Sequence, residues 1–349
     1  AARRAETRER ADLEAGMDPA TPWINLPEYV LYWLGGNRVA EFTNATHSGL
    51  IELKTGTWSS ELFERLGLSL DAAPPVVSSG STVGMLKGPL AKLAAYRSTA
   101  LIAPACHDTA SAIAGIGSRM EATAYICSGT WSLVGARLSQ AITSPEALMA
   151  RYTNQGAAGG GFLFHSNVNG MWLIKQCMES WAAKGRSWKI ETLVELAGET
   201  AASGIVDVDA DPLMLDGDMP RRINTELQNR GFAQIEDVAG NEPKFARVIF
   251  ESLAERYSTA LANLEEMLGK KLERIHILGG GSRTILLTQS TAERTGLPVE
   301  TGNAESSTIG NLAVQLADDS REDGKFNDDA IRKWAARLCN CSSIFPNGV

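Results

Sequence analysis

The chain has 349 residues, 44% of them hydrophobic and 21% charged, with a formal net charge of −8. This length allows two domains, and the acidic balance argues against nucleic-acid binding, which needs a basic face to displace phosphate counterions. No apolar run is long enough to span a membrane, and the first segment has no apolar core of the kind a signal peptide needs. We therefore expect a cytoplasmic protein that binds neither nucleic acid nor membrane.

Cysteines and histidines give no pattern of disulfides or metal ligands. The number of cysteines, five, is odd, and Cys106, Cys127 and Cys177 lie among apolar residues, which favours reduced, buried thiols. The four histidines are far apart in the sequence: His47, His107, His165 and His276. This spacing predicts no zinc cluster and no metal-ligating residues.

The first third of the chain mixes short apolar runs with turn residues. Apolar residues recur at helical spacing over 26–34, and the glycine pair at 35–36 ends this predicted helix. A second short helix is predicted over 61–66. Prolines, serines and glycines dominate residues 70–90, which we interpret as a surface loop.

Three short apolar runs, each followed by a polar or glycine-rich turn, are typical of buried strands that lead into a helix. The runs and their turns are 99–104 with His107-Asp108-Thr109, 122–127 with Ser128-Gly129-Thr130, and 274–278 with Gly279-Gly280-Gly281-Ser282. Alternation of such strands with helices predicts an α/β fold with largely buried sheets.

Helices are predicted where apolar residues step by three or four. The clearest is 244–268, which has one continuous apolar stripe. Others are predicted over 170–183, 284–295 and 307–316. Residues 200–243 are rich in Asp and Gly and have few periodic apolar positions, so we interpret them as loops and an insertion.

The glycine-rich and hydroxyl-bearing turns are candidate phosphate sites. Glycines at 279–281 let the backbone approach a ligand and leave helix amides free for an anion. Ser128 and Thr130 offer two hydroxyls directly after a strand. Each pattern also suits a plain turn that binds nothing, and the spacing matches neither a P-loop nor the dinucleotide-binding fingerprint.

Asp108 is a candidate catalytic base. At the end of a strand that faces a cleft, its carboxylate could accept a hydroxyl proton during phosphoryl transfer. Taken alone, Asp108 is better explained as the N-cap of the following helix, where it accepts backbone N–H bonds and suits the helix dipole. Asn167 and Asn169 precede another predicted helix and suit either capping or the binding of a polyol.

Taken together and in order, five stretches resemble the FGGY carbohydrate kinases, and among them the rhamnulokinases: HDTASA, YICSGTWSLVG, NGMWL, ILGGGS and ESSTIGNLAVQLA. The likeness extends over residues 22–316. It implies an actin-like (ribonuclease H-like) α/β fold with two domains around a central cleft. The implied division is a partial sugar-binding domain over 1–118, a nucleotide-binding domain over 119–320 and a tail over 321–349.

The resemblance also implies an activity and the residues that perform it. The activity is transfer of the γ-phosphoryl group of ATP, with Mg²⁺, to a primary hydroxyl of a ketose, with L-rhamnulose as the expected substrate and a monomer or homodimer as the expected assembly. Asp108 matches the catalytic base. The positions that match substrate contacts are His107, Asp108, Thr109 and Asn167. Those that match the ATP site are Thr130, Gly279, Gly280 and Gly281.

Two departures from the family pattern accompany this likeness. Lys175, followed by Gln176, stands where the rhamnulokinases carry a nucleotide-contacting glutamine, and a lysine there could still meet a phosphate. The family opens with a strand and an Asp-x-Gly-type phosphate loop that does not precede Ala1, so we expect an N-terminally truncated kinase. Two alternatives stay open: a non-catalytic fragment that binds sugar or nucleotide, and an FGGY kinase for another sugar such as xylulose, fuculose or glycerol.

Overall fold

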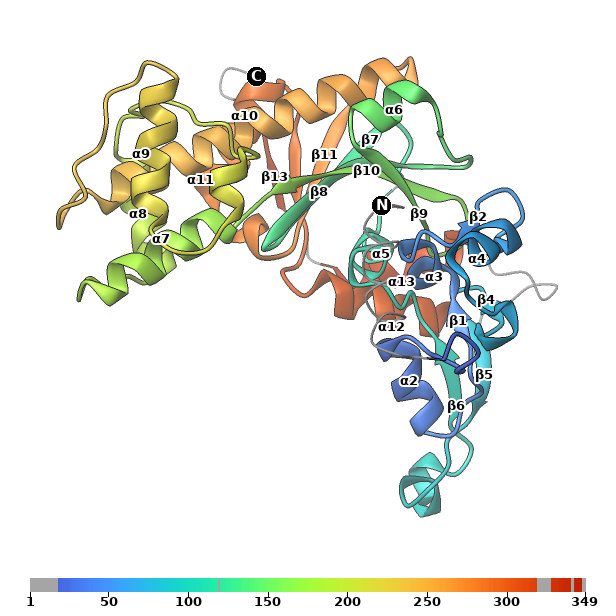
Figure 1. Cartoon of the computed structure of the whole chain (residues 1–349). Coiled ribbons are helices and arrows are strands. Elements are labelled where there is room, and N and C mark those ends of the chain that lie inside the picture. Colours follow the sequence, from blue (N-terminus) through green and yellow to red (C-terminus); the bar gives the residue numbers. More distant parts are fainter. Residues whose placement is uncertain (1–17, 119, 319–327, 340–341, 347–349) are drawn as a thin grey trace.

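The computed structural model describes residues 18–118, 120–318, 328–339 and 342–346. Two parts meet at an angle (Figure 1): a large part built on a seven-stranded sheet, and an arm that carries the short strands from the first third of the chain. Among the described residues, Cys106, Cys127 and Cys177 are free thiols; Cys177 is buried, whereas Cys106 and Cys127 are only partly buried. Residues 1–17 of the predicted first domain, 319–320 of the predicted second domain, and 321–327 and Cys341 of the predicted tail lie outside the described residues.

The large sheet is mixed, with the strand order β13-β12-β11-β7-β8-β10-β9. Three strands form its parallel centre: β7 (Thr123–Ser128), β11 (Arg274–Leu278) and β12 (Val299–Thr301). Antiparallel strands extend it on both sides: β8 (Trp131–Leu138), β10 (Phe162–Asn169), β9 (Tyr152–Gly156) and β13 (Ser342–Ile344). The predicted strands at 122–127 and 274–278 are therefore confirmed, and the structure shows that they are neighbours at the centre.

Helices cover both faces of this sheet because alternate residues of each strand point to opposite sides. In β7, Ala124 and Ile126 face one core and Tyr125 and Cys127 face the other. Helices of the first core are α7 (Trp172–Ala183), α8 (Ile190–Gly198), α9 (Met219–Asn229), α10 (Glu242–Leu268) and α11 (Ile285–Thr295). Helices of the second are α5 (Asp108–Ala114), α12 (Ser306–Asp318) and α13 (Asp328–Leu338). Short helix α6 (Pro145–Met149) joins β8 to β9.

The predicted helices of the large part are confirmed as α7, α10, α11 and α12. The longest, α10, has 27 residues and ends at Gly269, which takes the left-handed conformation that favours glycine after a helix. In the described part of the chain, no helix combines the length and apolar character needed to cross a membrane.

Residues 200–243 do not form only loops, so that interpretation is wrong. Helix α9 lies within them, and Met219, Ile223 and Leu227 recur every four residues on its buried side. Pro220 stands in the first turn, where a helix needs no N–H donor. The sequence does contain this periodic pattern, but it consists of only three apolar positions and is flanked by Asp and Gly.

The strands of the arm form two-stranded sheets. They are β1 (Ala40–Glu41) with β4 (Val76–Val77), β2 (Ile51–Glu52) with β3 (Thr57–Trp58), and β5 (Ser81–Met85) with β6 (Ala100–Ala103). Helices α2 (Leu26–Trp33), α3 (Phe42–His47) and α4 (Ser60–Leu66) lie among them. In the described residues, 3₁₀ turns lie in the arm at Leu70–Ala72, Leu90–Lys92 and Ala94–Tyr96, and in the large part at Asp211–Met214 and Gly280–Arg283.

The interpretation of residues 70–90 as a surface loop is wrong in part, because β4 and β5 lie there. The pairing of β5 with β6 shifts register between Thr82 and Gly84. At Gly84 an added Cβ would lie 2.8 Å from the Cα of Gly36. Glycine at this position thus allows two backbone segments to approach closely within a strand. In the sequence, the same glycine suggests a loop.

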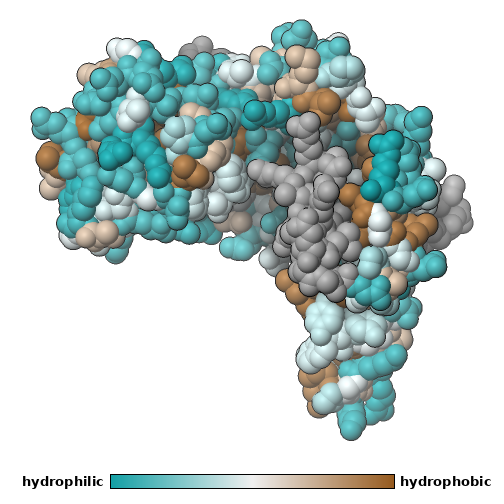
Figure 2. All heavy atoms as spheres, viewed as in Figure 1, coloured by the Kyte–Doolittle hydropathy of each residue, from teal (hydrophilic) through white to brown (hydrophobic). Residues whose placement is uncertain are grey.

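Helix α2 forms where predicted, but part of its apolar stripe faces solvent. Leu26 is 77% exposed and Val30 51% exposed, whereas the side chain of Glu28 is fully buried. The Glu28 carboxylate accepts the backbone N–H of Glu41 and the side-chain amide of Asn44, each at 2.9 Å. On the face shown in Figure 2, hydrophilic residues dominate the large part and hydrophobic residues appear on the arm.

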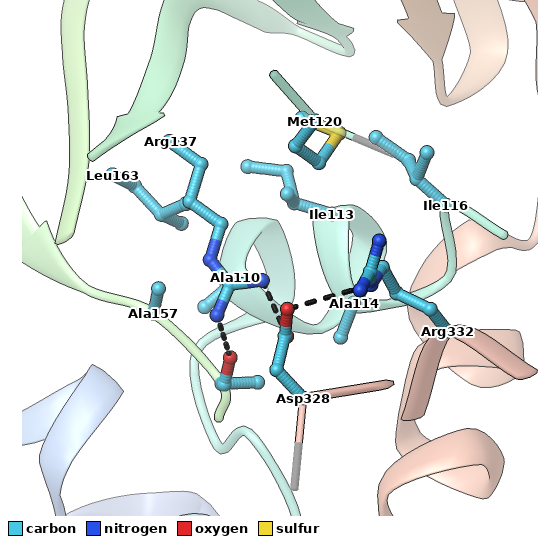
Figure 3. Close-up of a pocket in the computed structure, with 11 residues that line it drawn as sticks. Ala110, Ile113, Ala114, Ile116, Met120, Arg137, Ala157, Leu163, Asp328 and Arg332 are labelled. Atoms are coloured by element: carbon cyan, nitrogen blue, oxygen red, sulfur yellow. Dashed lines mark hydrogen bonds and ion pairs between the residues drawn. The ribbon is translucent and has the colours of Figure 1, made fainter. Parts of the chain in front are cut away.

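Helix α13 is tied to the sheet by a half-buried ion pair (Figure 3). Arg137 of β8 pairs with Asp328, the first residue of α13, and donates to the carbonyl oxygens of Ala158 and Gly160 at 3.0 Å each. Arg332 Nε lies 3.5 Å from Asp328 Oδ2. Loss of Asp328 would leave the largely buried Arg137 guanidinium without a carboxylate partner, so this contact helps to hold α13 on the core that also holds α5.

Helices α5 and α12 cross with almost no space between their backbones. An added Cβ on Gly310 of α12 would lie 1.6 Å from the carbonyl oxygen of Ser111 in α5, and one on Gly115 would lie 2.8 Å from the carbonyl oxygen of Ser306. The Ser111 hydroxyl donates to the Ser307 carbonyl at 2.7 Å. Only glycine at these positions allows so close an approach.

We predict that Gly310→Ala lowers the free energy of unfolding by about 1–3 kcal/mol, because the methyl group forces the two helices apart. Gly198→Ala is the matched control: no atom lies within 4 Å of its added Cβ, and alanine is the better helix former. Urea denaturation of both variants checks this. Equal stability of Gly310→Ala and the wild type would contradict the packing argument.

Candidate active site

The predicted catalytic turn starts helix α5, but the N-cap residue is His107 and Asp108 is the first helical residue. Oδ1 of Asp108 accepts the backbone N–H of Thr109 at 2.6 Å and lies 3.3 Å from its hydroxyl. The Asp108 side chain is 84% exposed. The cap prediction is thus one residue off, yet the carboxylate still bonds to the first helical turn and stays open to a ligand.

His107 lowers the pKa of the Asp108 carboxyl. Its Nδ1 lies 3.1 Å from Asp108 Oδ1 and 3.2 Å from the Thr109 nitrogen. The Thr109 N–H points to two acceptors, Asp108 Oδ1 and His107 Nδ1. When Nδ1 carries a proton, it donates to Asp108 instead. This hydrogen bond is the main cause that lowers the pKa of Asp108 from 3.8 to about 2. At neutral pH Asp108 is therefore an acceptor only.

Three of the four histidines gather at this turn although they are far apart in the sequence. The ring centroids of His47, at the end of α3, and His107 are 4.5 Å apart. His165 of β10 is buried, with Nδ1 2.8 Å from the Tyr125 hydroxyl. Burial, then the charges of His107 and His47, lowers the pKa of His165 to about 3. Burial, then His107, also lowers the pKa of His47, so both rings are neutral at pH 7.

Asn167 lies on the same side of the sheet as α5. Cys127, Leu133 and Asn167 are paired directly across β7, β8 and β10, and directly paired residues point to one face. Cys127 packs against the α5 core, and the charge of Asp108 adds to burial in raising the pKa of its thiol. Asn167 is exposed on that face, whereas Asn169 is buried and donates to backbone carbonyls.

The two predicted phosphate turns meet at one edge of the sheet because β7 and β11 are adjacent and parallel. A Cβ on Gly281 would lie 2.1 Å from Ser128 Oγ, and one on Gly279 would lie 2.9 Å from the Ser128 carbonyl oxygen. Gly279 also has a φ of 78°. Gly280 differs, because an added Cβ there meets no atom within 4 Å.

Thr130 and Gly280 line one cavity of about 950 Å³, with walls from α8, α10 and α11. This volume is in the range of ligand pockets that hold a cofactor. Ile190 and Val194 supply apolar wall, and the cationic Arg283 follows the glycine turn. Of the four predicted ATP residues, two therefore face the cavity, while Gly279 and Gly281 pack behind them against Ser128.

Lys175, and not Gln176, is the member of that pair left open to a ligand. Lys175 lines a neighbouring cavity of about 460 Å³ that shares Met171 and Ile190 with the larger one. Its Nζ lies 3.8 Å from Glu179 Oε1 at the surface. Gln176 is buried, where it donates to Glu179 at 2.6 Å and accepts the backbone N–H of residue 217 at 3.3 Å.

We predict that the Asp108 carboxyl titrates with a midpoint near 2 and that His107→Ala raises this midpoint toward 3.8, because the largest cause of the low pKa is removed. Ionised Asp108 thus stabilises the folded chain above about pH 4, and this contribution is lost as the pH falls toward 2. Carbon-13 NMR of the labelled carboxyl checks both values. A wild-type midpoint near 4 would contradict the geometry.

The chain matches two sequence profiles of one protein family. Residues 6–115 match the N-terminal domain, and residues 124–318 the C-terminal domain, of the FGGY family of carbohydrate kinases. A rhamnulokinase of Bacteroides thetaiotaomicron is 31% identical over 306 residues, which are 88% of this chain and 62% of that protein. A rhamnulokinase of Enterococcus faecalis is 34% identical over 299 residues, 85% of this chain and 59% of that protein. The chain thus spans about three fifths of the length of these relatives.

Solved structures share the architecture at lower sequence identity. A ligand-bound xylulose kinase from Lactobacillus acidophilus has a TM-score of 0.71 at 19% identity, covering 94% of this chain and 64% of that one. Glycerol kinase from Plasmodium falciparum with ADP has a TM-score of 0.67 at 12% identity, covering 93% and 62%. These likenesses confirm the predicted actin-like α/β fold. By both sequence profiles and by its curated relatives, the chain belongs to the FGGY family of carbohydrate kinases.

Proposed function

We propose that this chain provides the catalytic base and the nucleotide site of a kinase that phosphorylates L-rhamnulose on its primary hydroxyl, giving L-rhamnulose 1-phosphate. One observation carries the proposal. Asp108 is exposed at the first residue of α5, a helix that packs against the face of β7 that carries Cys127. The turn after β7 carries Thr130, which lines the cavity of about 950 Å³. Phosphoryl transfer to a hydroxyl needs a carboxylate that can take the hydroxyl proton close to the bound nucleotide.

In this proposal Asp108 orients the sugar hydroxyl and takes its proton as the hydroxyl oxygen bonds to the γ-phosphorus of ATP. The bond from that phosphorus to the bridging oxygen breaks, and ADP leaves. A carboxyl with a pKa of about 2 is a weak base, but the transition state is loose, so position and charge matter more than basicity. Mg²⁺, bound to ATP oxygens, would supply charge neutralisation at the phosphates.

The sugar would lie against the α5 face of the sheet. His107, neutral His47 and exposed Asn167 offer donors and acceptors for its other hydroxyls on that face. The Thr109 hydroxyl already lies 3.3 Å from Asp108, so we assign Thr109 to orienting the base. His47 is an addition to the predicted sugar-contacting residues.

ATP would occupy the cavity at the edge of β7 and β11. The open space at Gly280 is what a phosphate group would fill, since a side chain there would meet no protein atom. Backbone amides of the two turns would bind the phosphates, and the apolar wall from α8 would contact the base. Lys175 borders the adjoining cavity and could reach a phosphate only by moving away from Glu179.

The choice of L-rhamnulose rests on the curated relatives named above, which are rhamnulokinases. The solved structures with the same fold are kinases for xylulose and glycerol, among others. The competing assignments are therefore other ketoses or polyols for the same chemistry, and binding of sugar and nucleotide without turnover.

We predict that the wild-type chain forms ADP faster with L-rhamnulose than with D-xylulose, L-fuculose or glycerol, and that Asp108→Asn lowers kcat by about 10²–10⁴-fold. Binding of ATP should not change, because Asp108 lies outside the cavity lining. A coupled ADP assay and calorimetry measure these quantities, with the exposed Asp71→Asn as control. Activity of Asp108→Asn above about a tenth of wild type would refute the base assignment, and binding of both ligands without turnover would favour the non-catalytic alternative.

We predict that substitutions of two neighbouring glycines affect different properties, one the affinity for ATP and the other the stability of the fold. Gly280→Ala should weaken ATP binding by about tenfold and leave unfolding unchanged, because its methyl group meets only open space beside the cavity. Gly281→Ala should lower stability, because its Cβ would lie 2.1 Å from Ser128 Oγ. Calorimetry with ATP and urea denaturation separate the two effects. Unchanged ATP affinity in Gly280→Ala would place the nucleotide elsewhere.

A further inference from the structure

A buried carboxylate lies directly beneath the catalytic turn and is not among the residues assigned above. Glu41 is fully buried, at the N-cap of α3. Its Oε1 accepts the backbone N–H of Thr43 at 3.1 Å and the hydroxyl of Ser79 at 2.5 Å. Its Oε2 accepts the hydroxyl of Thr43 at 2.5 Å and the backbone N–H of Cys106 at 2.9 Å.

Two of these bonds connect Glu41 to the residues just before Asp108. The first is direct, to the backbone N–H of Cys106, which is 65 residues away in the sequence. The second runs through Thr43, whose Oγ1 accepts the backbone N–H of His107 at 3.2 Å while its own proton goes to Glu41. One carboxylate thus holds two successive amides of the turn and, through Ser79, the loop before β5.

All four partners of Glu41 are donors, two on each oxygen. An ionised carboxylate accepts all of them. In either orientation, an amide would place its NH₂ group against one backbone N–H and against one hydroxyl that would have to turn its proton away. Burial raises the pKa of Glu41, and the four hydrogen bonds oppose that effect. A site so completely matched to an acceptor tolerates no donor without rearrangement of the turn.

We propose that Glu41 is a positioning residue for phosphoryl transfer. It fixes the Cys106–His107 backbone, and through it the place and hydrogen bonds of the Asp108 carboxylate. This role rests on the proposed function of Asp108. This role differs from a general contribution to the stability of the arm. A displacement of a reacting group by about 1 Å costs about 10²-fold in rate, so loss of Glu41 should lower kcat. It should leave the affinity for the nucleotide, which would bind in the large part, unchanged.

Glu28 provides the matched control for a purely structural role. It is equally buried in the same arm and bonds to Glu41 N and Asn44, but to nothing in the 106–108 turn. Glu28→Gln should therefore lower stability as Glu41→Gln does, while leaving the turn in place.

The test measures amide hydrogen exchange of the peptide 104–109 and steady-state kinetics in Glu41→Gln, Glu28→Gln and the wild type. In Glu41→Gln we expect exchange at Cys106 and His107 to rise at least tenfold and kcat to fall about ten- to a hundredfold, with the KM for ATP within twofold. Glu28→Gln should leave all three near wild type. Wild-type exchange and kcat in Glu41→Gln would overturn the proposal, as would an equal loss of kcat in Glu28→Gln.

Two further arms keep the test decisive. If Glu41→Gln does not fold, Thr43→Val removes the hydroxyl link but keeps the side-chain shape, and unchanged exchange of the His107 amide in this variant would overturn the proposal. If the wild type phosphorylates no ketose, the function of Asp108 fails, and the exchange measurement still decides whether Glu41 anchors the turn.

Discussion

Close packing of α5 against α12 determines where the turn that carries Asp108 lies. Asp108 is the first residue of α5, and α12 follows β12, which pairs with the nucleotide-side strand β11. At the crossing, Gly310 leaves no room for even a methyl group against Ser111. Because neither helix can slide without a backbone collision, the position of Asp108 relative to the carboxyl edge of the sheet is fixed by packing.

Two carboxylates near this crossing, Asp108 and Glu41, differ in solvent exposure and in hydrogen bonding. Asp108 is exposed, so it remains available to a ligand, and the hydrogen bond to His107 lowers the pKa of its carboxyl. Glu41 is buried and accepts four hydrogen bonds, so its carboxylate holds the backbone of the neighbouring segments in place. The neutral His47 and His165 complete the surroundings without adding charge. The proposed site, with an uncharged sugar beside a polyanionic nucleotide, would need this separation of roles.

Sequence patterns predicted the elements whose signals are local: β7 and β11 with their turns, the apolar stripe of α10, and Asp108 at the start of α5. They failed where the determinant is tertiary. Nothing in the spacing connects Glu41 to Cys106, and the exposed side of α2 follows from burial of Glu28, which periodicity does not encode. Helix α9 and strand β5 were missed because glycines, prolines and acidic residues, which serve caps and bulges there, read as loop signals.

The central claim is that a sugar on the α5 face and a nucleotide in the cavity meet at Asp108. A crystal structure with L-rhamnulose and a non-hydrolysable ATP analogue tests this most directly. The account predicts a primary hydroxyl within hydrogen-bond distance of an Asp108 oxygen, with the terminal phosphate beside it and the other phosphates at Thr130 and Gly280. A sugar bound away from Asp108, or a nucleotide outside the cavity formed by α8, α10 and α11, would contradict it.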